Sequence, residues 1–290
     1  MPELPDLAVV ADAFHAALTG RSITRAEAPA PLAVRGTPAE LQALVGQGLR
    51  GVRRRGKFVL FDLDRDRIAV NAMLTGQFQL ARPADKLPPS TAVILAFGPR
   101  AAIPRDAARW TRRADWLPPN DEPAELRYRD PSQMGKVYLL PAASDRPVPG
   151  LDDDQGPDAD SPELTLDVWR TRIKRHPGEL KSLLRNQAFV AGIGNAYGDE
   201  ILHAAKLSPF RKRSSLAPEE VDALYEATRT TLARATEVLR ERVPPTFEKQ
   251  VRDFLAVHLR GGESCPRCGT RISEVSSRSE ATSWCRGCQR

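Results

Sequence analysis

Residues 187–200 read QAFVAGIGNAYGDE, a turn with two closely spaced glycines between segments of helical character. Gly192 and Gly194 allow positive φ angles and a close approach of the backbone to another group, and Asn195 tolerates the left-handed region. The unpaired N–H groups at the start of the following helix attract anions. The stretch predicts one of two structures: a backbone grip for phosphate, or a tight helix–helix turn that binds no ligand.

The residues around this turn favour the phosphate grip. Residues 171–213 contain nine Lys or Arg side chains against three acids, and Lys181 and Arg185 come just before the turn. The whole chain has a formal net charge of +6. Because a field of one sign concentrates a polyanion near the surface, we expect a polyanionic partner.

The composition is that of a globular protein. Of the 290 residues, 41% are hydrophobic and 28% are charged, which suffices for two domains with separate cores. The sequence contains neither a long apolar run nor a basic leader followed by an apolar region. We therefore expect a cytoplasmic protein with no membrane contact.

The chain begins Met1-Pro2-Glu3. Removal of Met1 would leave a prolyl secondary amine beside a carboxylate. An α-amino group has a reference pKa of about 7.7–8.0, against about 10.4 for lysine, so far more of it is neutral at neutral pH. The start of the chain is therefore either a nucleophile or an ordinary tail.

A first domain is expected over residues 1–144. Apolar residues at helical spacing from Leu7 to Leu18 predict a first helix with one buried face, and period-two segments predict antiparallel strands. The expected strands lie at 23–25, 49–52, 58–61, 68–70 and 92–97, with a last strand ending at 140; the rest of 81–129 is assigned to an insertion. Lys57, just after a glycine turn, is either a surface charge or a phosphate contact.

The composition changes sharply at residues 145–167, which hold eight acids and one arginine among Pro, Gly and Ser. This stretch predicts an interdomain linker. Beyond it, residues 168–256 are expected to form a second, helical domain. Helices are predicted over 166–175, 177–184, 196–205 and 218–242.

All four cysteines lie near the chain end, as Cys265-Pro-Arg-Cys268 and, after sixteen intervening residues, Cys285-Arg-Gly-Cys288. Two C-x-x-C pairs at this spacing predict a closed tetrahedral site for one structural Zn²⁺ within residues 257–290. This region also carries Arg271, Arg278 and Arg286 and could insert an arginine at DNA.

Several segments together resemble formamidopyrimidine-DNA glycosylase and endonuclease VIII. They occur in the same order over nearly the whole chain: MPELPD (1–6), RRGKFVL (54–60), NAMLTG (71–76), RDPSQMG (129–135), the glycine turn with Ser208-Pro-Phe-Arg211, and the Cys₄ hairpin ending WCRGCQR (284–290).

The resemblance implies an α+β fold: an N-terminal two-sheet β-sandwich with flanking helices, then a helix–two-turn–helix bundle and a β-hairpin zinc finger. It implies a base-excision repair enzyme that is both a DNA glycosylase and an AP lyase, cutting the strand by β,δ-elimination. Pro2 corresponds to the nucleophile, Glu3 to the acid that protonates the sugar ring oxygen, and Lys57 to the lysine that contacts the phosphates of the lesion.

The resemblance also implies a set of DNA contacts. By position these are Asn71, Leu74, Ser132, Gln133, Met134, Lys181, Gly194, Asn195 and Arg278. Asn71 stands where the family has histidine, and Leu74 where it has a void-filling methionine. Ser132 and Met134 replace the arginine and phenylalanine of the same trio, so the opposite-base preference is expected to differ.

Lesion choice is also expected to differ from that of the guanine-specific branch. Residues 243–254 are too few for the longer loop that covers 8-oxoguanine there, so 8-oxoguanine should be a poor substrate. Oxidised pyrimidines, ring-opened purines, hydantoins or abasic sites are the expected substrates. The expected partner is damaged DNA, bound by a monomer that needs no small-molecule cofactor.

Two other interpretations stay open. A protein of the same fold could bind damaged DNA or abasic sites without catalysis, and an unrelated zinc-ribbon protein could bind RNA. Intact Pro2, Glu3 and Lys57 argue against the first, and the glycine turn argues against the second. The four histidines are expected to be structural or surface residues: His15, His176, His203 and His258.

Overall fold

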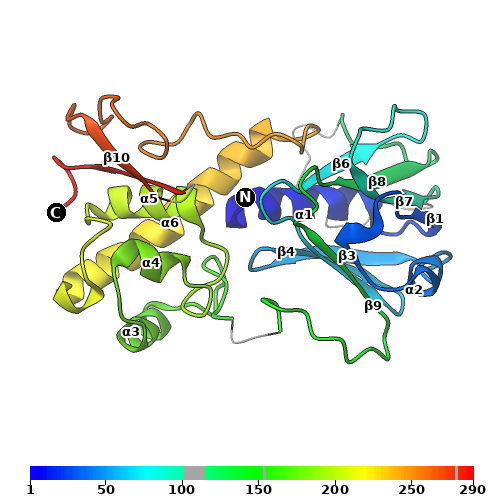
Figure 1. Ribbon diagram of the computed structural model, residues 1–290, viewed down its shortest axis with the longest axis horizontal. Helices are drawn as coiled ribbons and strands as arrows, with labels where there is room; N and C mark the ends of the chain where they lie inside the picture. The colour runs from blue at the N-terminus through cyan, green and yellow to red at the C-terminus, as the bar shows by residue number, and fades with distance from the viewer. Residues whose placement is uncertain (101–114, 153–154, 278–279) are drawn as a thin grey trace. The chain divides into compact units, whose positions relative to one another are not determined.

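The computed structural model describes residues 1–100, 115–152, 155–277 and 280–290. Figure 1 follows the chain from helix α1 in blue to the hairpin β10–β11 in red. The chain clusters into two compact units. The β unit comprises Met1–Pro2, Asp6–Leu151 and Leu239–Gln250, and the helical unit comprises Glu3–Pro5, Asp152–Val238 and Val251–Arg290.

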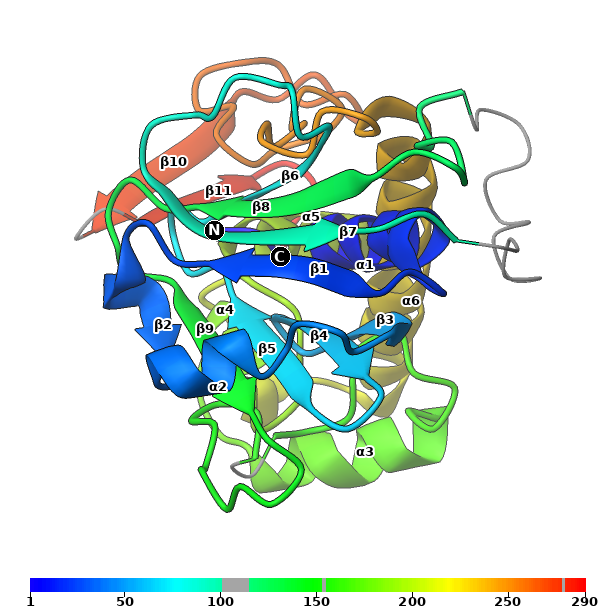
Figure 2. The ribbon, with the colours of Figure 1, turned by 90° about the vertical axis from the view of Figure 1, so that its right-hand side faces the viewer.

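The β unit contains two sheets, of strand order β1-β7-β8-β6 and β2-β9-β5-β4-β3, which form two layers in Figure 2. Neighbouring strands are antiparallel except for β2 and β9. The strands are β1 (Ile23–Glu27), β2 (Val34–Arg35), β3 (Leu49–Arg55), β4 (Phe58–Leu63), β5 (Arg67–Asn71), β6 (Gln77–Ala81), β7 (Thr91–Phe97), β8 (Ala124–Arg129) and β9 (Lys136–Leu140). The short helices η1 (Pro31–Ala33) and α2 (Pro38–Gln42) complete the unit together with most of α1 (Leu4–Leu18).

Helix α1 is buried on nearly all sides, rather than on one face as the apolar spacing predicts. Its Ala13, Ala16 and Ala17 are as inaccessible as its larger residues. Phe14 packs against Phe61 of β4 at 6.3 Å and Phe78 of β6 at 6.0 Å between ring centroids, so it contacts both sheets. Alanines read as neutral positions in the sequence, but here their small size lets the helix lie close to both layers.

The strand predicted at 92–97 is β7, but the assignment of the rest of 81–129 to an insertion is wrong at β8, which pairs with β7 in the four-stranded sheet. Strand β8 reads AELRYR and was missed because it carries charges. Glu125 and Arg127 are buried and form an ion pair of 2.7 Å, which compensates their loss of hydration.

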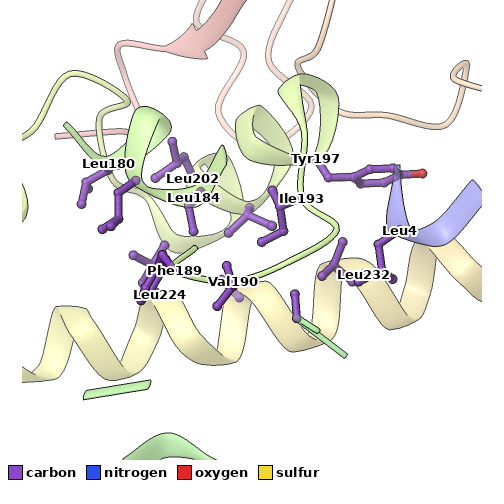
Figure 3. Packing of buried hydrophobic residues seen from close by; sticks show 14 of the residues in the cluster. Leu4, Leu180, Leu184, Phe189, Val190, Ile193, Tyr197, Leu202, Leu224 and Leu232 are labelled. Atoms are coloured by element: carbon purple, nitrogen blue, oxygen red, sulfur yellow. The ribbon is translucent and has the colours of Figure 1, made fainter. Parts of the chain in front are cut away.

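The helical unit contains α3 (Leu166–Arg175), α4 (Leu180–Arg185), α5 (Asn195–Ala205), η3 (Arg213–Ser215), most of α6 (Pro218–Arg242), and the strands β10 (Ile272–Ser277) and β11 (Glu280–Cys285). Its core gathers apolar side chains from all four α-helices and from the glycine turn, with Leu184, Phe189, Val190 and Leu224 among those in Figure 3. Helices α3 and α6 have the predicted bounds. Helix α4 starts three residues later than predicted, after Gly178 at φ +117°.

The acidic stretch 145–167 is partly built into the helical unit. The Gly156 amide donates to the Gln187 carbonyl at 2.8 Å, and the Ala159 amide donates to the Ala191 carbonyl at 3.0 Å. Ala159 and Leu164 belong to the buried core. The second half of this stretch therefore packs against the glycine turn and is not an extended linker.

Among the described residues, none of the helices combines the length and the apolar character that a membrane span needs.

Candidate active site and metal centre

The start of helix α5 holds a carboxylate of the same chain. Glu3 accepts hydrogen bonds from the amides of Gly194 (2.7 Å), Ala196 (2.8 Å) and Tyr197 (3.2 Å), and its own side chain is buried. These are the unpaired amides that the sequence assigned to phosphate. In the structure these amides bind the Glu3 carboxylate of the same chain, so the Gly194 amide predicted to contact DNA is already used within the chain.

The two glycines of the turn make room for residues 3 and 4. Gly192 has φ +100°, and a Cβ there would lie 2.8 Å from Leu4 Cβ. A Cβ on Gly194 would lie 2.4 Å from Glu3 Cδ. The Leu4 amide donates to the Gly192 carbonyl at 2.9 Å. Gly192 and Gly194 thus leave the space that residues 3 and 4 occupy. This contact joins residues some 190 positions apart, and the sequence did not indicate it.

Pro2 lies at a cavity of 320 Å³ within the β unit. Its lining combines apolar side chains with amide, carboxylate and ammonium groups. The lining residues are Met1, Pro2, Asp6, Leu7, Val10, Leu74, Thr75, Gly76, Gln77, Phe78, Val243, Phe247, Glu248, Lys249 and Gln250. A secondary amine at Pro2 would therefore open into a space with both flat apolar surface and hydrogen-bonding groups.

Asp130 joins two loop tips that border this region. Its carboxylate accepts from the Thr75 hydroxyl at 2.5 Å and from the Gly135 amide at 2.6 Å, while Ser132 contacts both Thr75 and Asp130. The tips expose Leu74 (54%) and Met134 (41%). Ser132 is thus turned toward its own loop. Gln133 is exposed at φ +55°.

The remaining predicted contacts of the β unit lie at strand ends. Lys57 follows Gly56, which has φ +55°, in the tight turn between β3 and β4, and its side chain is half-buried. The Asn71 side chain accepts from the Met73 amide at 3.0 Å and shapes the turn that presents Leu74.

Lys181 is buried, 6% exposed, and is a structural residue in this protein rather than a surface phosphate contact. Its ammonium pairs with Asp199 at 2.7 Å and donates to the Ala281 carbonyl and the Thr282 hydroxyl, both at 2.9 Å. Burial lowers the pKa of Lys181, and the charge of Asp199 opposes that shift. The side-chain amide of Asn195 also donates to the Ala281 carbonyl, at 2.8 Å.

Two adjacent acids of α5, missed by sequence reasoning, fasten the C-terminal segment. Asp199 also contacts His258 Nδ1 at 2.8 Å and the Ser283 amide at 3.2 Å. Glu200 accepts from three successive amides, 256 to 258, at 2.7–2.9 Å. The only signal in the sequence was that two neighbouring acids lie in a helix whose other residues are mostly apolar.

The four cysteine sulfurs form one cluster, each within 4.8 Å of the others. Two of the separations are 3.9 Å for Cys265 and Cys288, and 3.5 Å for Cys268 and Cys285. A tetrahedron with metal–sulfur distances of about 2.3 Å has edges of roughly 3.8 Å, so the cluster fits a four-thiolate metal ion. Arg278, the predicted DNA contact of this hairpin, lies outside the described residues.

A histidine of α5 accompanies this cluster. His203 is 5% exposed, and its Nε2 lies 3.4 Å from Cys265 Sγ. Burial, with a smaller contribution from the charge of Arg267, lowers the pKa of His203 to about 4, so the ring is neutral at neutral pH.

The chain belongs to the formamidopyrimidine-DNA glycosylase family. Residues 1–137 match the family's N-terminal domain and residues 155–243 its H2TH domain, the helix–two-turn–helix. Formamidopyrimidine-DNA glycosylase of Symbiobacterium thermophilum is 32% identical, with all of this chain and 89% of the relative covered. The enzyme of that name from Geobacillus kaustophilus is 31% identical with both chains fully covered.

Solved structures share the fold. The Lactococcus lactis Fpg in complex with DNA containing an abasic site superposes with a TM-score of 0.81 at 24% identity, covering 99% of each chain. MutM in complex with DNA containing carbocyclic 8-oxo-G gives the same TM-score and identity over both full chains. The predicted α+β architecture of two N-terminal sheets, C-terminal helices and a Cys₄ hairpin is confirmed.

Proposed function

We propose that this protein is a base-excision repair DNA glycosylase with AP lyase activity, acting through the secondary amine of Pro2. One observation carries the proposal: the residue after Pro2 is a buried carboxylate held by three helix amides. An ordinary tail does not require a turn whose glycines leave room for residues 3 and 4. A nucleophile at the chain end does require it, because fixing Glu3 also restricts the position of the Pro2 nitrogen.

In the proposed reaction, the Pro2 nitrogen bonds to C1′ of the damaged nucleoside as the bond from C1′ to the base breaks. The base leaves with the bonding electrons and takes up a proton. Glu3 receives the proton that the attacking amine loses and passes it to the sugar ring oxygen as the ring opens. The carboxylate then balances the charge of the iminium.

Strand cleavage follows from that iminium, which makes the C2′ proton acidic. Loss of this proton expels the 3′ phosphate, and a second elimination expels the 5′ phosphate. Water then releases the sugar fragment and restores the amine. Removal of Met1 is a precondition of this chemistry.

Damaged DNA is the proposed partner. The basic residues that remain exposed near the glycine turn supply attraction without sequence readout, and Lys57 is assigned to phosphate contact. The Cys₄ cluster is assigned to one Zn²⁺, which with four thiolates has no open position and acts structurally. Its proposed effect is to keep the hairpin folded against α5.

For the lesion, we expect oxidised pyrimidines, ring-opened purines, hydantoins or abasic sites in preference to 8-oxoguanine. The short segment 243–254 and the inward hydroxyl of Ser132 support this expectation. Excision rates on matched duplexes, each with one lesion opposite each of the four bases, are the measurement. Excision of 8-oxoguanine opposite cytosine as fast as that of a hydantoin contradicts it.

The decisive experiment for the chemistry is borohydride trapping on an abasic-site duplex. The wild type should give a covalent adduct that mass spectrometry places on Pro2, whereas Pro2→Gly and Glu3→Gln should give little. Pro5→Gly is the matched control because it removes a neighbouring proline from the first turn of α1 and should still trap. A processed, DNA-binding wild type without an adduct would instead support a damage-binding protein without catalysis.

A further inference from the structure

Helix α5 supplies a side chain to the cysteine cluster from outside the cysteine motif. The His203 ring is buried, and its Nε2 lies 3.4 Å from Cys265 Sγ, within the range of a hydrogen bond to sulfur. The contact joins residues 62 positions apart, from a helix to the first C-x-x-C pair.

The imidazole lies beside the cluster without being part of it. Among the described residues, the set of candidate ligand atoms that all lie within 4.8 Å of one another contains the four cysteines and no histidine. A fifth protein ligand would also exceed the fourfold coordination of a structural zinc site. The chemistry left to the ring is to donate its N–H to the sulfur.

The position of His203 is fixed from a second side. The guanidinium of Arg267, between Cys265 and Cys268, donates to the His203 carbonyl at 2.7 Å. The first C-x-x-C pair thus holds both the main chain and the ring of the same residue. The residues that follow the second pair also contact the chain at the end of α5. The Arg290 backbone amide donates to the Lys206 carbonyl at 3.1 Å, and the Gln289 side-chain amide donates to the Leu207 carbonyl at 2.9 Å.

We infer that His203 is a positioning residue of the metal centre, donating a hydrogen bond from Nε2 to the Cys265 thiolate. The inference rests on the metal site of the proposed function but not on its catalytic chemistry. A hydrogen bond to a metal-bound sulfur draws off negative charge and fixes the direction of the sulfur lone pairs, so the sulfur would dissociate from the metal less readily. Removing such outer partners typically weakens metal affinity by about 10–100-fold.

Nuclear magnetic resonance of the wild type loaded with ¹¹³Cd²⁺ and labelled with ¹⁵N tests the bond directly. The expected result is a scalar coupling between ¹¹³Cd and the His203 Nε2–H, transmitted through the hydrogen bond and the sulfur. A cadmium signal typical of four thiolates together with an uncoupled or unprotonated Nε2 overturns the inference. Failure to bind cadmium at all would instead overturn the metal site.

Variants give an independent readout. With His203→Phe, metal affinity should fall by about 10–100-fold and the sulfur-to-metal charge-transfer band of the Co²⁺-loaded protein should move to longer wavelength. His203→Gln retains an N–H donor and should recover part of both. His176→Phe changes a histidine that packs on Phe189, away from the cysteines, and should leave both unchanged. Equal losses in the Phe and Gln variants would reduce His203 to a packing residue.

Discussion

At the scale of single residues, Gly194 is where backbone geometry and proposed chemistry meet. A Cβ at this position would overlap the Glu3 carboxylate, so Gly194→Ala must move the acid, the turn or both. We expect loss of the covalent adduct in borohydride trapping while metal content stays at the wild-type value. Since three N–H groups would lose their partner, stability should also fall by about 1–3 kcal/mol.

The matched control is Gly198→Ala, one turn further along the same helix. A Cβ on Gly198 would have its nearest neighbours at ordinary contact distances of 3.9–4.0 Å. Replacing glycine by alanine inside a helix stabilises by roughly 0.5–1 kcal/mol, so this variant should trap normally and melt slightly higher. Equal damage from both substitutions would show that α5 tolerates no added methyl group, and would remove the special role of Gly194.

Residue-scale prediction from the sequence succeeded where chemistry is written in local spacing. Cys265, Cys268, Cys285 and Cys288 follow a metal-ligand pattern that needs no knowledge of the fold. Lys181 shows the limit, because a lysine beside a glycine turn in a basic stretch has the same local signature whether it faces DNA or a buried carboxylate. Only Asp199, eighteen positions away, distinguishes the two.

At the scale of elements, Lys181 ties α4 to α5 and to the hairpin. With Lys181→Met, the Asp199 carboxylate is left buried without its countercharge, and breaking such a pair from one side costs about 3–5 kcal/mol. Urea unfolding should show this loss. Lys174→Met is the control, since Lys174 is an exposed residue of α3 and its replacement should leave stability unchanged. A variant as stable as the wild type but weaker on DNA would return Lys181 to phosphate contact.

An ion pair at the start of α6 should make a pH-dependent contribution to the free energy of unfolding. Hydrogen bonds from Arg211 (2.5 and 2.7 Å), then from the Ala217 amide, hold the pKa of Glu220 below its usual value. A depressed carboxyl pKa stabilises the fold above the unfolded value near 4.5, and this contribution disappears as pH falls through the folded value. Because both side chains are partly exposed, the difference between wild type and Glu220→Gln at pH 7 should be below about 1 kcal/mol and should shrink as the pH falls below the unfolded value.

Elements with a regular apolar period were predicted at or near their true ends, as α3 and α6 show. Strand β8 was missed because its pattern of apolar and charged residues marks a surface unless the charges compensate each other, as Glu125 and Arg127 do. Helix α1 was found, but its burial on all sides was not, since alanine carries little periodic signal.

At the scale of the whole molecule, the metal is expected to stabilise one part of the chain selectively. Chelation of the bound ion should unfold the β10–β11 hairpin and release its contacts with α5, with the β sheets retained. Circular dichroism, hydrogen exchange and metal analysis on the same sample check this, with one metal ion per chain before treatment. Uniform loss of exchange protection in both units would contradict a local role.

Long-range contacts limited prediction at this scale. Residues 239–250 are the last turn of α6 and the segment after it, in the domain expected over 168–256, yet they cluster with the β unit. Phe247 packs on Phe14 at 5.4 Å between ring centroids, and Arg240 pairs with Asp12 at 2.6 Å. No composition shift marks this passage, because the partners lie more than two hundred positions away.

Because residues 3 and 4 are fixed in the glycine turn, the position of the N-terminal amine depends on where translation starts and on what is left ahead of Pro2. With Glu3 and Leu4 fixed by their hydrogen bonds to the turn, the few bonds between the Pro2 nitrogen and Glu3 limit where that nitrogen can lie. One inserted codon between Pro2 and Glu3 would shift the amine by up to about 3.8 Å while the seat stayed filled. A start codon placed upstream, or an affinity tag left ahead of Pro2, should therefore yield a well-folded protein that does not trap, whereas a removable leader cleaved directly before Pro2 should yield an active one.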